Sequence, residues 1–284
     1  MNQPSPIVLP QQIVAANMTA AKGKTALPLL RIILLGIFAG MFIACGASAS
    51  SVAMHAVANV GLARLVAGCV FPIGLMMIVF VGGELFTGDC LMIMGCMHKE
   101  FSVWKMLKVL IVVWISNFIG SAIFAAMVNA STQYNFTSGL LGAFTIKVAM
   151  GKLGMSFQSA FISGILCNFF VCIAVLMAAA AKDIAGKVWA IFFPIMAFVV
   201  SGYEHCVANM YYIPAGIFAA GNEAYVQKAM ETYGYTAAQL DGLNWEAMVI
   251  ANLLPVTLGN IVGGMALVGL PLYLIHGAKI RQEY

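Results

Sequence analysis

The sequence predicts an all-α integral membrane protein with six transmembrane helices, of which the second and the fifth are broken near their middles. Hydrophobic residues make up 62% of the 284 residues and charged residues only 8%, and the mean hydropathy is +0.97. A soluble domain carries about 25% charged residues. The third observation is a series of apolar runs, each long enough to cross the hydrocarbon core of a bilayer, which takes about 20 helical residues.

Six apolar runs follow one another along the chain, at residues 32–54, 65–97, 109–128, 153–181, 188–221 and 247–275. The second and fifth runs are longer than one crossing requires, and glycine and acidic residues interrupt them in GGELFTGD at 82–89 and SGYEHCVAN at 201–209. Backbone that leaves the helix at membrane depth is tolerated only where it is buried in protein or lines a cavity. Each break is therefore predicted to border a pathway through the membrane.

The positive charges predict the orientation of the chain. Six spans place both ends on one side of the membrane, and that side holds ten Lys and Arg residues against four on the other. Because cytoplasmic loops carry the excess of Lys and Arg, both termini are predicted to be cytoplasmic in a multi-pass protein of the cell (inner or plasma) membrane. Residues 1–25 are then a cytoplasmic N-terminal segment, 26–276 the transmembrane domain and 277–284 a cytoplasmic tail, with the loop 222–246 facing outward.

A weak internal repeat links the third run to the sixth. SNFIGSA at 116–122 resembles GNIVGGM at 259–265, which places Asn117 and Asn260 143 positions apart. The two breaks are 118 positions apart when Thr87 is matched with His205. Two copies of three spans each must be inverted relative to one another, although Gly-rich membrane helices also resemble each other by chance.

Inversion would bring the N-termini of two half-helices to the centre of the membrane. Each carries about half an elementary positive charge, so the pair favours an anion there. The same arrangement repels protons and cations in a water channel. The helix dipoles alone therefore leave the substrate open.

Four motifs together resemble the formate/nitrite transporter family in their order and spacing: GGELFTGD, GILCN at 164–168, SGYEHCVANMYYIP at 201–214 and LLPVTLGNIVGG at 253–264. The resemblance covers the chain from about residue 26 to residue 276. It implies an aquaporin-like fold with an inverted repeat, and a homopentamer in the lipid bilayer with one pore in each protomer. It also implies passage of small monovalent anions or their conjugate acids, such as formate, nitrite or hydrosulfide, often coupled to protons.

The resemblance assigns roles to three residues of the pore. His205 resembles the central histidine, whose imidazole can donate a hydrogen bond or a proton to an anion, and the alternative is a neutral histidine that braces the loop. Thr87 resembles the threonine that faces this histidine, and a helix N-cap is its alternative role. Lys152 resembles the lysine of the vestibule by its spacing to GILCN, although Lys147 competes for this role and the residues after Lys152 depart from the Val-His-His-Thr pattern of many relatives.

Five polar residues are predicted to brace the pore or its breaks. Asn168 and Asn209 resemble family positions that line or brace the pore, where amides can satisfy freed backbone groups. Glu84, Asp89 and Glu204 are expected to accept hydrogen bonds from loop amides and helix N-termini, because a carboxylate would repel an anion at the central site.

Two groups of apolar residues are predicted by the same resemblance to form constrictions on either side of the central site: Phe71 with Phe198, and Leu75 with Leu85 and Phe86. Large apolar side chains remove water from a narrowing, so a bare ion meets a high barrier and a neutral acid a low one. Lipid contact or packing is the generic role of such residues in a membrane helix.

These observations predict a proton-linked channel or facilitator for a small monovalent anion. The preferred substrate is formate, because NMYYIP, the long outward loop and LLPVT resemble the formate branch of the family. Nitrite is the second candidate, and hydrosulfide is a third alternative. An aquaporin-like conduit would instead carry an Asn at the head of each half-helix and an Arg in the pore, and a membrane scaffold or sensor would show no flux. No motif indicates an enzyme, a metal, another cofactor or a nucleic-acid partner, and the seven cysteines have no CxxC spacing.

Overall fold

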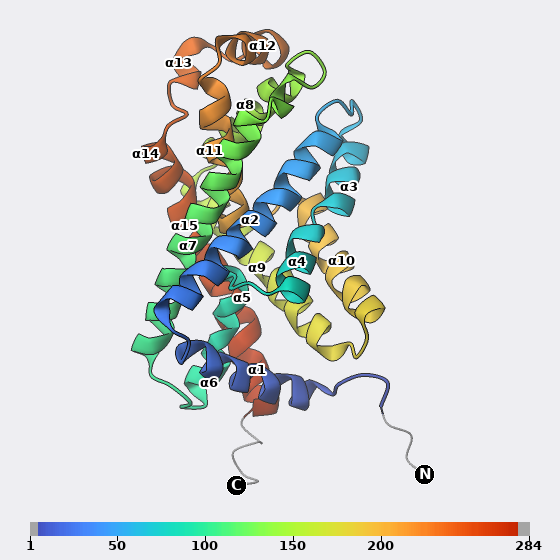
Figure 1. The fold of residues 1–284 in the computed structure, drawn as a ribbon, viewed down its shortest axis with the longest axis vertical. Helices are drawn as coiled ribbons and strands as arrows, with labels where there is room; N and C mark the ends of the chain where they lie inside the picture. The colour runs from blue at the N-terminus through green and yellow to red at the C-terminus, as the bar shows by residue number, and fades with distance from the viewer. Residues whose placement is uncertain (1–4, 278–284) are drawn as a thin grey trace.

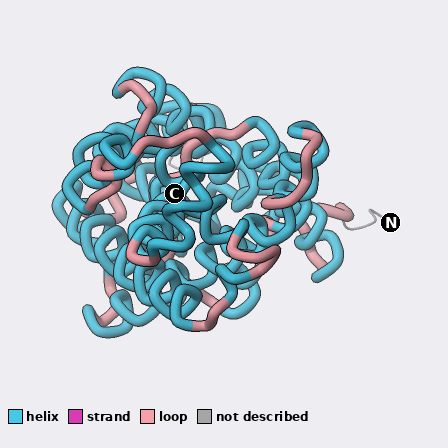
Figure 2. The backbone as a smooth tube through the Cα atoms, turned by 90° about the horizontal axis from the view of Figure 1, so that it is seen from above, coloured by secondary structure: helices cyan, strands magenta, loops and turns pink. Residues whose placement is uncertain are grey.

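The computed structural model describes residues 5–277, which form helices and loops and no strand (Figure 2). Six helices within this range are long and apolar enough to cross a membrane, which confirms the predicted fold class. The spanning segments are α2 (Leu29–Met54), α3 with α4 (Val60–Val70 and Ile73–Val81), α7 (Val103–Ala130), α9 (Phe157–Ala180), α10 (Ile184–Ser201) and a last segment from Trp245 to Gly277.

The second and fifth spans are broken where the sequence predicts. α4 ends at Val81, and a half-helix resumes at Phe86 as α5 (Phe86–Asp89), a 3-10 turn (Cys90–Met92) and α6 (Ile93–Met97). α10 ends at Ser201, and α11 (Cys206–Ala220) follows. The non-helical stretches are four residues each, 82–85 and 202–205. Gly82 and Gly202 end the first halves with φ of 103° and 75°, a region that glycine enters without steric cost.

Two pairs of helices form the framework around the breaks. α2 packs along α7, and α9 packs along α15 (Leu254–Ile261) and the turns that follow it. A Cβ atom on Gly120 would lie 2.0 Å from the Ile37 carbonyl oxygen, and one on Gly263 would lie 2.2 Å from that of Ile165. Only glycine allows the backbones to approach so closely, and the two contacts are equivalent in the two halves of the chain.

The last span alternates between α-helix and wider π-helical turns. Pro255 and Pro271 lie within it and cannot donate to an i→i−4 hydrogen bond, which is a common reason for irregular helix. In order, its elements are α14 (Trp245–Ala247), π-turns at Met248–Leu253, α15, π-turns at Val262–Gly269, α16 (Leu270–Leu272) and π-turns at Tyr273–Gly277.

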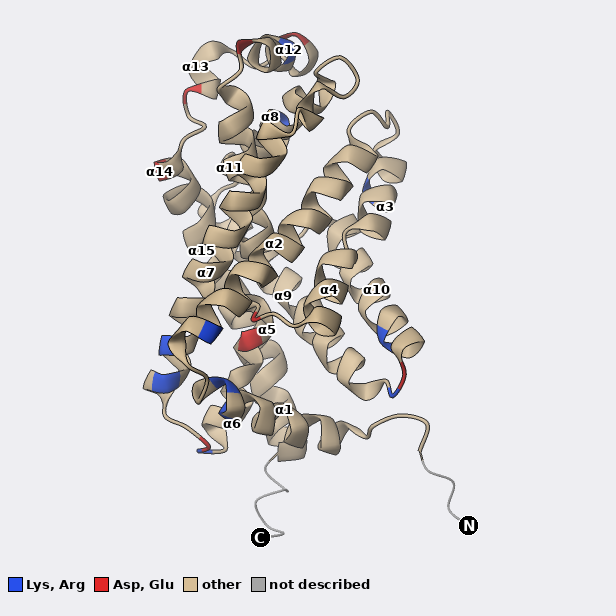
Figure 3. Ribbon diagram, viewed as in Figure 1, with Lys and Arg blue, Asp and Glu red and all other residues tan. Residues whose placement is uncertain are grey.

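Helices also cover the two ends of the bundle, where the sequence analysis expects a polar segment and loops. At one end α1 (Pro10–Thr25) lies across α6 and the end of the last span (Figure 1). At the other end α8 (Leu140–Leu153), α12 (Glu223–Tyr233) and α13 (Ala237–Leu240) form what we call the cap. Charged residues gather mainly at these two ends, and acidic residues beside α5 are an exception (Figure 3).

Candidate functional site

The two breaks meet at a buried hydrogen bond between Thr87 and His205. Thr87 Oγ1 lies 2.9 Å from His205 Nε2, and the two residues are 0% and 3% exposed. Thr87 lies in the first turn of the half-helix that begins at Phe86, and His205 is the N-cap of α11. The N-terminal ends of both half-helices therefore converge on one place inside the protein, as the inverted repeat predicts.

The hydrogen bonds of His205 identify its protonated nitrogen. Its Nδ1 accepts from the backbone N–H of Ala208 at 3.0 Å, so this nitrogen carries no proton. A neutral imidazole keeps its proton on the other nitrogen, so Nε2 donates to the hydroxyl of Thr87. The hydroxyl proton of Thr87 is then free to point elsewhere, and an anion beside it would accept that proton in a hydrogen bond.

Asn117 on α7 holds the first break in place. Its Oδ1 accepts from the backbone N–H of Phe86 at 3.0 Å. Its Nδ2 donates to the carbonyl oxygens of Gly36 at 2.8 Å and Glu84 at 2.9 Å. One buried amide thus binds three backbone groups. Two of them, at Glu84 and Phe86, are freed by the break and would otherwise be unpaired at membrane depth.

Asn260 on α15 does the same at the second break. Its Oδ1 accepts from the N–H of Cys206 at 2.9 Å. Its Nδ2 donates to the carbonyl oxygens of Gly164 at 2.7 Å and Glu204 at 3.0 Å. The equivalence of Asn117 and Asn260 predicted from the sequence is confirmed, and it extends to every backbone partner.

These hydrogen bonds correct the register between the breaks. Phe86 is equivalent to Cys206, and the two positive-φ glycines, Gly82 and Gly202, agree with this pairing, so the offset is 120 positions and the expected 118 is wrong. Short motifs of similar composition do not fix a register to two residues. The counterpart of His205 is consequently Leu85, and Thr87 faces His205 without being its symmetry equivalent.

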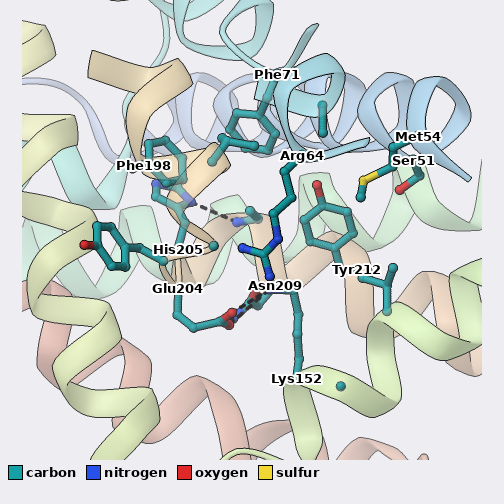
Figure 4. A pocket seen from close by; sticks show the side chains of 17 residues that line it. Ser51, Met54, Arg64, Phe71, Lys152, Phe198, Glu204, His205, Asn209 and Tyr212 are labelled. Carbon is teal, nitrogen blue, oxygen red and sulfur yellow. Dashed lines mark hydrogen bonds and ion pairs between the residues drawn. The ribbon is translucent and has the colours of Figure 1, made fainter. Parts of the chain in front are cut away.

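Lys152 and His205 line the same pocket, which has a volume of about 270 Å³ and lies beside α8 (Figure 4). Lys152 Nζ donates to both carboxylate oxygens of Glu204, at 2.9 and 3.1 Å, and lies 5.2 Å from the centre of the Tyr212 ring. Lys147 lies over the ring of Tyr233 at 4.7 Å. Of the two candidate lysines, the structure brings Lys152 to the pocket of His205.

The carboxylate of Glu204 has side-chain partners instead of the expected loop amides. Besides Lys152 it accepts from Asn209 Nδ2 at 2.6 Å, and Asn209 also donates to Asn252 Oδ1 at 2.7 Å. A buried carboxylate such as that of Glu204 gains more from a cation and an amide than from the few backbone N–H groups of a four-residue loop.

Asn168, predicted to brace the pore, donates to the carbonyl oxygens of Thr87 at 3.1 Å and Asn260 at 2.7 Å.

The predicted constriction residues occupy different surroundings. The rings of Phe71 and Phe198 meet edge to face with centroids 5.6 Å apart and line the pocket of His205. Leu75 and Leu85 are buried, at 2% and 4% exposed. Phe86 lines an apolar groove between α7 and α15 and is absent from the described lining of the His205 pocket.

Comparison with known proteins identifies the family of this chain. The family described as "Formate/nitrite transporter" matches residues 11–274. The chain belongs to the formate/nitrite transporter family. The family resemblance is thereby confirmed, and with its apolar spanning helices the chain is a multi-pass membrane protein of a transporter family.

Named relatives cover nearly the whole chain. A probable formate transporter of Methanothermobacter thermautotrophicus is 37% identical over 274 residues, 90% of this chain and 92% of that protein. The formate channel FocA of Escherichia coli K12 is 29% identical over 97% of this chain and 96% of its own. A solved structure described as a pentameric formate channel with formate bound is 32% identical, with a TM-score of 0.77 over 87% of this chain and 97% of that one.

A second lysine, not predicted from the sequence, occupies an equivalent place beside the first break. Lys24 of α1 makes ion pairs with Glu84, at 2.6 Å, and with Asp89, so these two carboxylates also have a lysine where loop amides are expected. Burial by itself lowers the pKa of Lys24, but the carboxylates of Asp89 and Glu84 raise it above its ordinary value. Lys24 precedes Lys152 by 128 positions, the offset that also relates Gly36 to Gly164. Once the hydrogen bonds of Asn117 and Asn260 establish this offset, it identifies Lys24.

Proposed function

We propose that this protein is a channel for small monovalent anions, that formate is its preferred substrate and that the flux is linked to protons. The observation that carries the proposal is the buried contact of Thr87 with His205 at the converging ends of two half-helices. There a positive potential and a free hydroxyl donor face a permeant anion. The relatives named as formate channels or transporters support formate over nitrite and hydrosulfide.

The path runs from the cap to α1. An anion enters the pocket of Lys152, passes the rings of Phe71 and Phe198, and accepts a hydrogen bond from Thr87. The proton linkage uses His205: protonation of Nδ1 breaks its bond to Ala208, and the charged imidazole can then neutralise or protonate the anion. The permeant species continues between Leu75 and Leu85 toward α1 as a nearly neutral species, because an apolar narrowing opposes a bare charge.

We further propose the assembly and orientation of the protein. A homopentamer with one pore in each protomer is supported by the solved relative described as a pentameric formate channel. The excess of Lys and Arg at the α1 end supports cytoplasmic termini and an outward-facing cap. Residues 26–276 then form the channel domain between cytoplasmic segments at 1–25 and 277–284, of which residues 1–4 and 278–284 lie outside the described residues.

Uptake of labelled formate into liposomes that contain the purified protein tests the proposal. Uptake should exceed that of empty liposomes and rise as the external pH falls. His205→Phe should remove or shift this pH dependence. His98→Phe should keep it, because His98 lies after α6 and packs on Tyr273, away from the breaks. Liposomes that conduct water but exclude formate, nitrite and hydrosulfide would instead indicate an aquaporin-like conduit.

A further inference from the structure

Arg64 on α3 is a charged group of the His205 pocket that has no part in the proposed path. The charged residues that line this pocket are Arg64, Lys152 and Glu204. Lys152 and Glu204 neutralise each other through two hydrogen bonds. The ion pairs among residues 5–277 use Lys22, Lys24 and Lys152, and none of them includes Arg64. The net positive charge of the pocket therefore resides on the guanidinium of Arg64.

The guanidinium is held in position but keeps most of its donors free. Its Nη1 donates to the Val200 carbonyl oxygen at 3.3 Å. The same nitrogen lies 2.5 Å from where a Cβ atom of Gly202 would be, so the missing side chain of Gly202 makes room for it. Arginine carries five N–H donors in a planar fork, and Val200 is the acceptor found for it among the described residues. A planar face with free N–H groups remains available.

Arg64 also stands where two hollows adjoin. Besides the pocket of His205, it lines a second pocket of about 510 Å³ nearer the cap, which includes His55, Lys147 and Tyr233. Met54, Arg64, Val148 and Gly151 belong to both linings. In Figure 4 the side chain of Arg64 extends into the pocket of His205, between Phe71 and Lys152. A solute that moves from this second pocket, which we call the cap pocket, to His205 through the shared lining would pass the guanidinium.

We propose that Arg64 is a specificity-determining residue that binds the permeant anion before it reaches Phe71 and Phe198, and that it selects planar anions with two oxygen atoms. A guanidinium binds a carboxylate through two parallel N–H···O bonds, which a lysine cannot reproduce. Formate and nitrite offer two oxygens in one plane, whereas hydrosulfide offers a single sulfur. This inference rests on the proposed function as an anion channel and names the group that recognises the anion.

The test measures the concentration dependence of uptake for formate and hydrosulfide at a pH where both are anions. Arg64→Gln should raise the apparent KM for formate about tenfold, the worth of a charge-assisted pair, and that for hydrosulfide about twofold, while the maximal rate changes little. Arg64→Lys should raise the formate KM about threefold and leave hydrosulfide near the wild-type value, because charge is kept and the fork is lost. Lys147→Gln, which removes a charge from the cap pocket alone, should affect both anions equally.

Two results would overturn the inference. If Arg64→Gln lowers only the maximal rate, by the same factor for both anions, Arg64 merely supports the turn at Val200 and Gly202. If Arg64→Lys matches the wild type for formate, the planar fork plays no part. Thermal unfolding of each variant checks its folding, and stabilisation by added formate gives a binding readout without flux. If wild-type liposomes take up no anion, the proposed function fails, while loss of that stabilisation in Arg64→Gln still tests the binding site.

Discussion

The two breaks have the same framework and different chemistry. In both, a glycine with positive φ ends the first helix, a glutamate follows two residues later, and a buried asparagine of the neighbouring span binds the same three backbone groups. A lysine reaches each glutamate, Lys24 in the first half and Lys152 in the second. The position after the glutamate differs, with Leu85 in one break and His205 in the other.

This difference separates the residues that brace both breaks from Thr87 and His205, which we propose act on the permeant species. Freed backbone groups need partners in both halves, so the asparagines, glycines and ion pairs occur twice. A site near the middle of the membrane needs only one imidazole, and Thr87 crosses from the other half to meet it. Changes in the paired residues should therefore have similar effects in the two halves, whereas changes at Thr87 and His205 should have no counterpart.

The largest effect is expected when either framework asparagine is replaced by leucine. Asn117→Leu or Asn260→Leu leaves the two backbone groups freed by its break unpaired, at about 1–2 kcal/mol each, although membrane hydrogen bonds average less. We expect a loss of about 3 kcal/mol of stability in both variants, measured by thermal unfolding in detergent. Asn129→Leu, at the exposed end of α7, should behave as wild type. If only one of the two asparagines is essential, the framework is not symmetric.

The two lysines should differ in degree. Lys24→Met leaves two carboxylates of Glu84 and Asp89 without their cation, whereas Lys152→Met leaves Glu204 with its bond to Asn209. Removing one partner of a buried pair costs about 3–5 kcal/mol, and the partial exposure of Lys24 reduces this to about 2 kcal/mol. In thermal unfolding, Lys24→Met should be less stable than Lys152→Met. Lys24→Arg keeps the positive charge and should recover most of the lost stability. The reverse ranking would show that Glu84 and Asp89 need their lysine less than Glu204 does.

The glycines of the breaks should tolerate different replacements. Gly202 has φ 75° and ψ 29°, the left-handed helical region, where alanine costs about 1–2 kcal/mol and asparagine less. Gly82 has φ 103° and ψ 133°, a region nearly restricted to glycine, where a side chain costs up to about 3 kcal/mol. Gly202→Asn should thus be more stable than Gly202→Ala in thermal unfolding. Gly82→Asn and Gly82→Ala should both be much less stable than the wild type. Equal stability of Gly82→Asn and the wild type would show that this glycine is dispensable.

The sequence predicted the spans, the breaks and the pairing of Asn117 with Asn260, because these depend on hydropathy and on glycine and asparagine in apolar surroundings. It also named Thr87, Lys152 and His205, which the structure brings to the breaks and their adjoining pocket. Their roles in transport stay predictions. Phe86 shows the limit of a motif, since adjacent residues of the half-helix point in different directions and only coordinates place its ring in the groove of α7 and α15.

Other features depend on contacts between segments far apart in the chain. Lys24 lies in a polar segment, and nothing in that segment shows that α1 folds back across the bundle to reach Glu84 and Asp89. The lysine that Glu204 accepts from lies 52 positions earlier. Arg64 fills the room that the missing side chain of Gly202 leaves, 138 positions away in the chain. Hydropathy carries no information about such pairings.

The smallest effect is expected at Thr87, where the two halves differ. Thr87→Val keeps the shape of the side chain and removes the hydroxyl that accepts from His205 Nε2, at a cost of about 1 kcal/mol. The imidazole then keeps its bond from Ala208 but loses its acceptor, so formate uptake should become slower and its dependence on external pH should shift. Thr87→Ser retains a hydroxyl and should restore both. If the valine and serine variants show the same uptake at every pH, the contact between Thr87 and His205 has no part in transport, and the asymmetry of the two breaks must act through His205 alone.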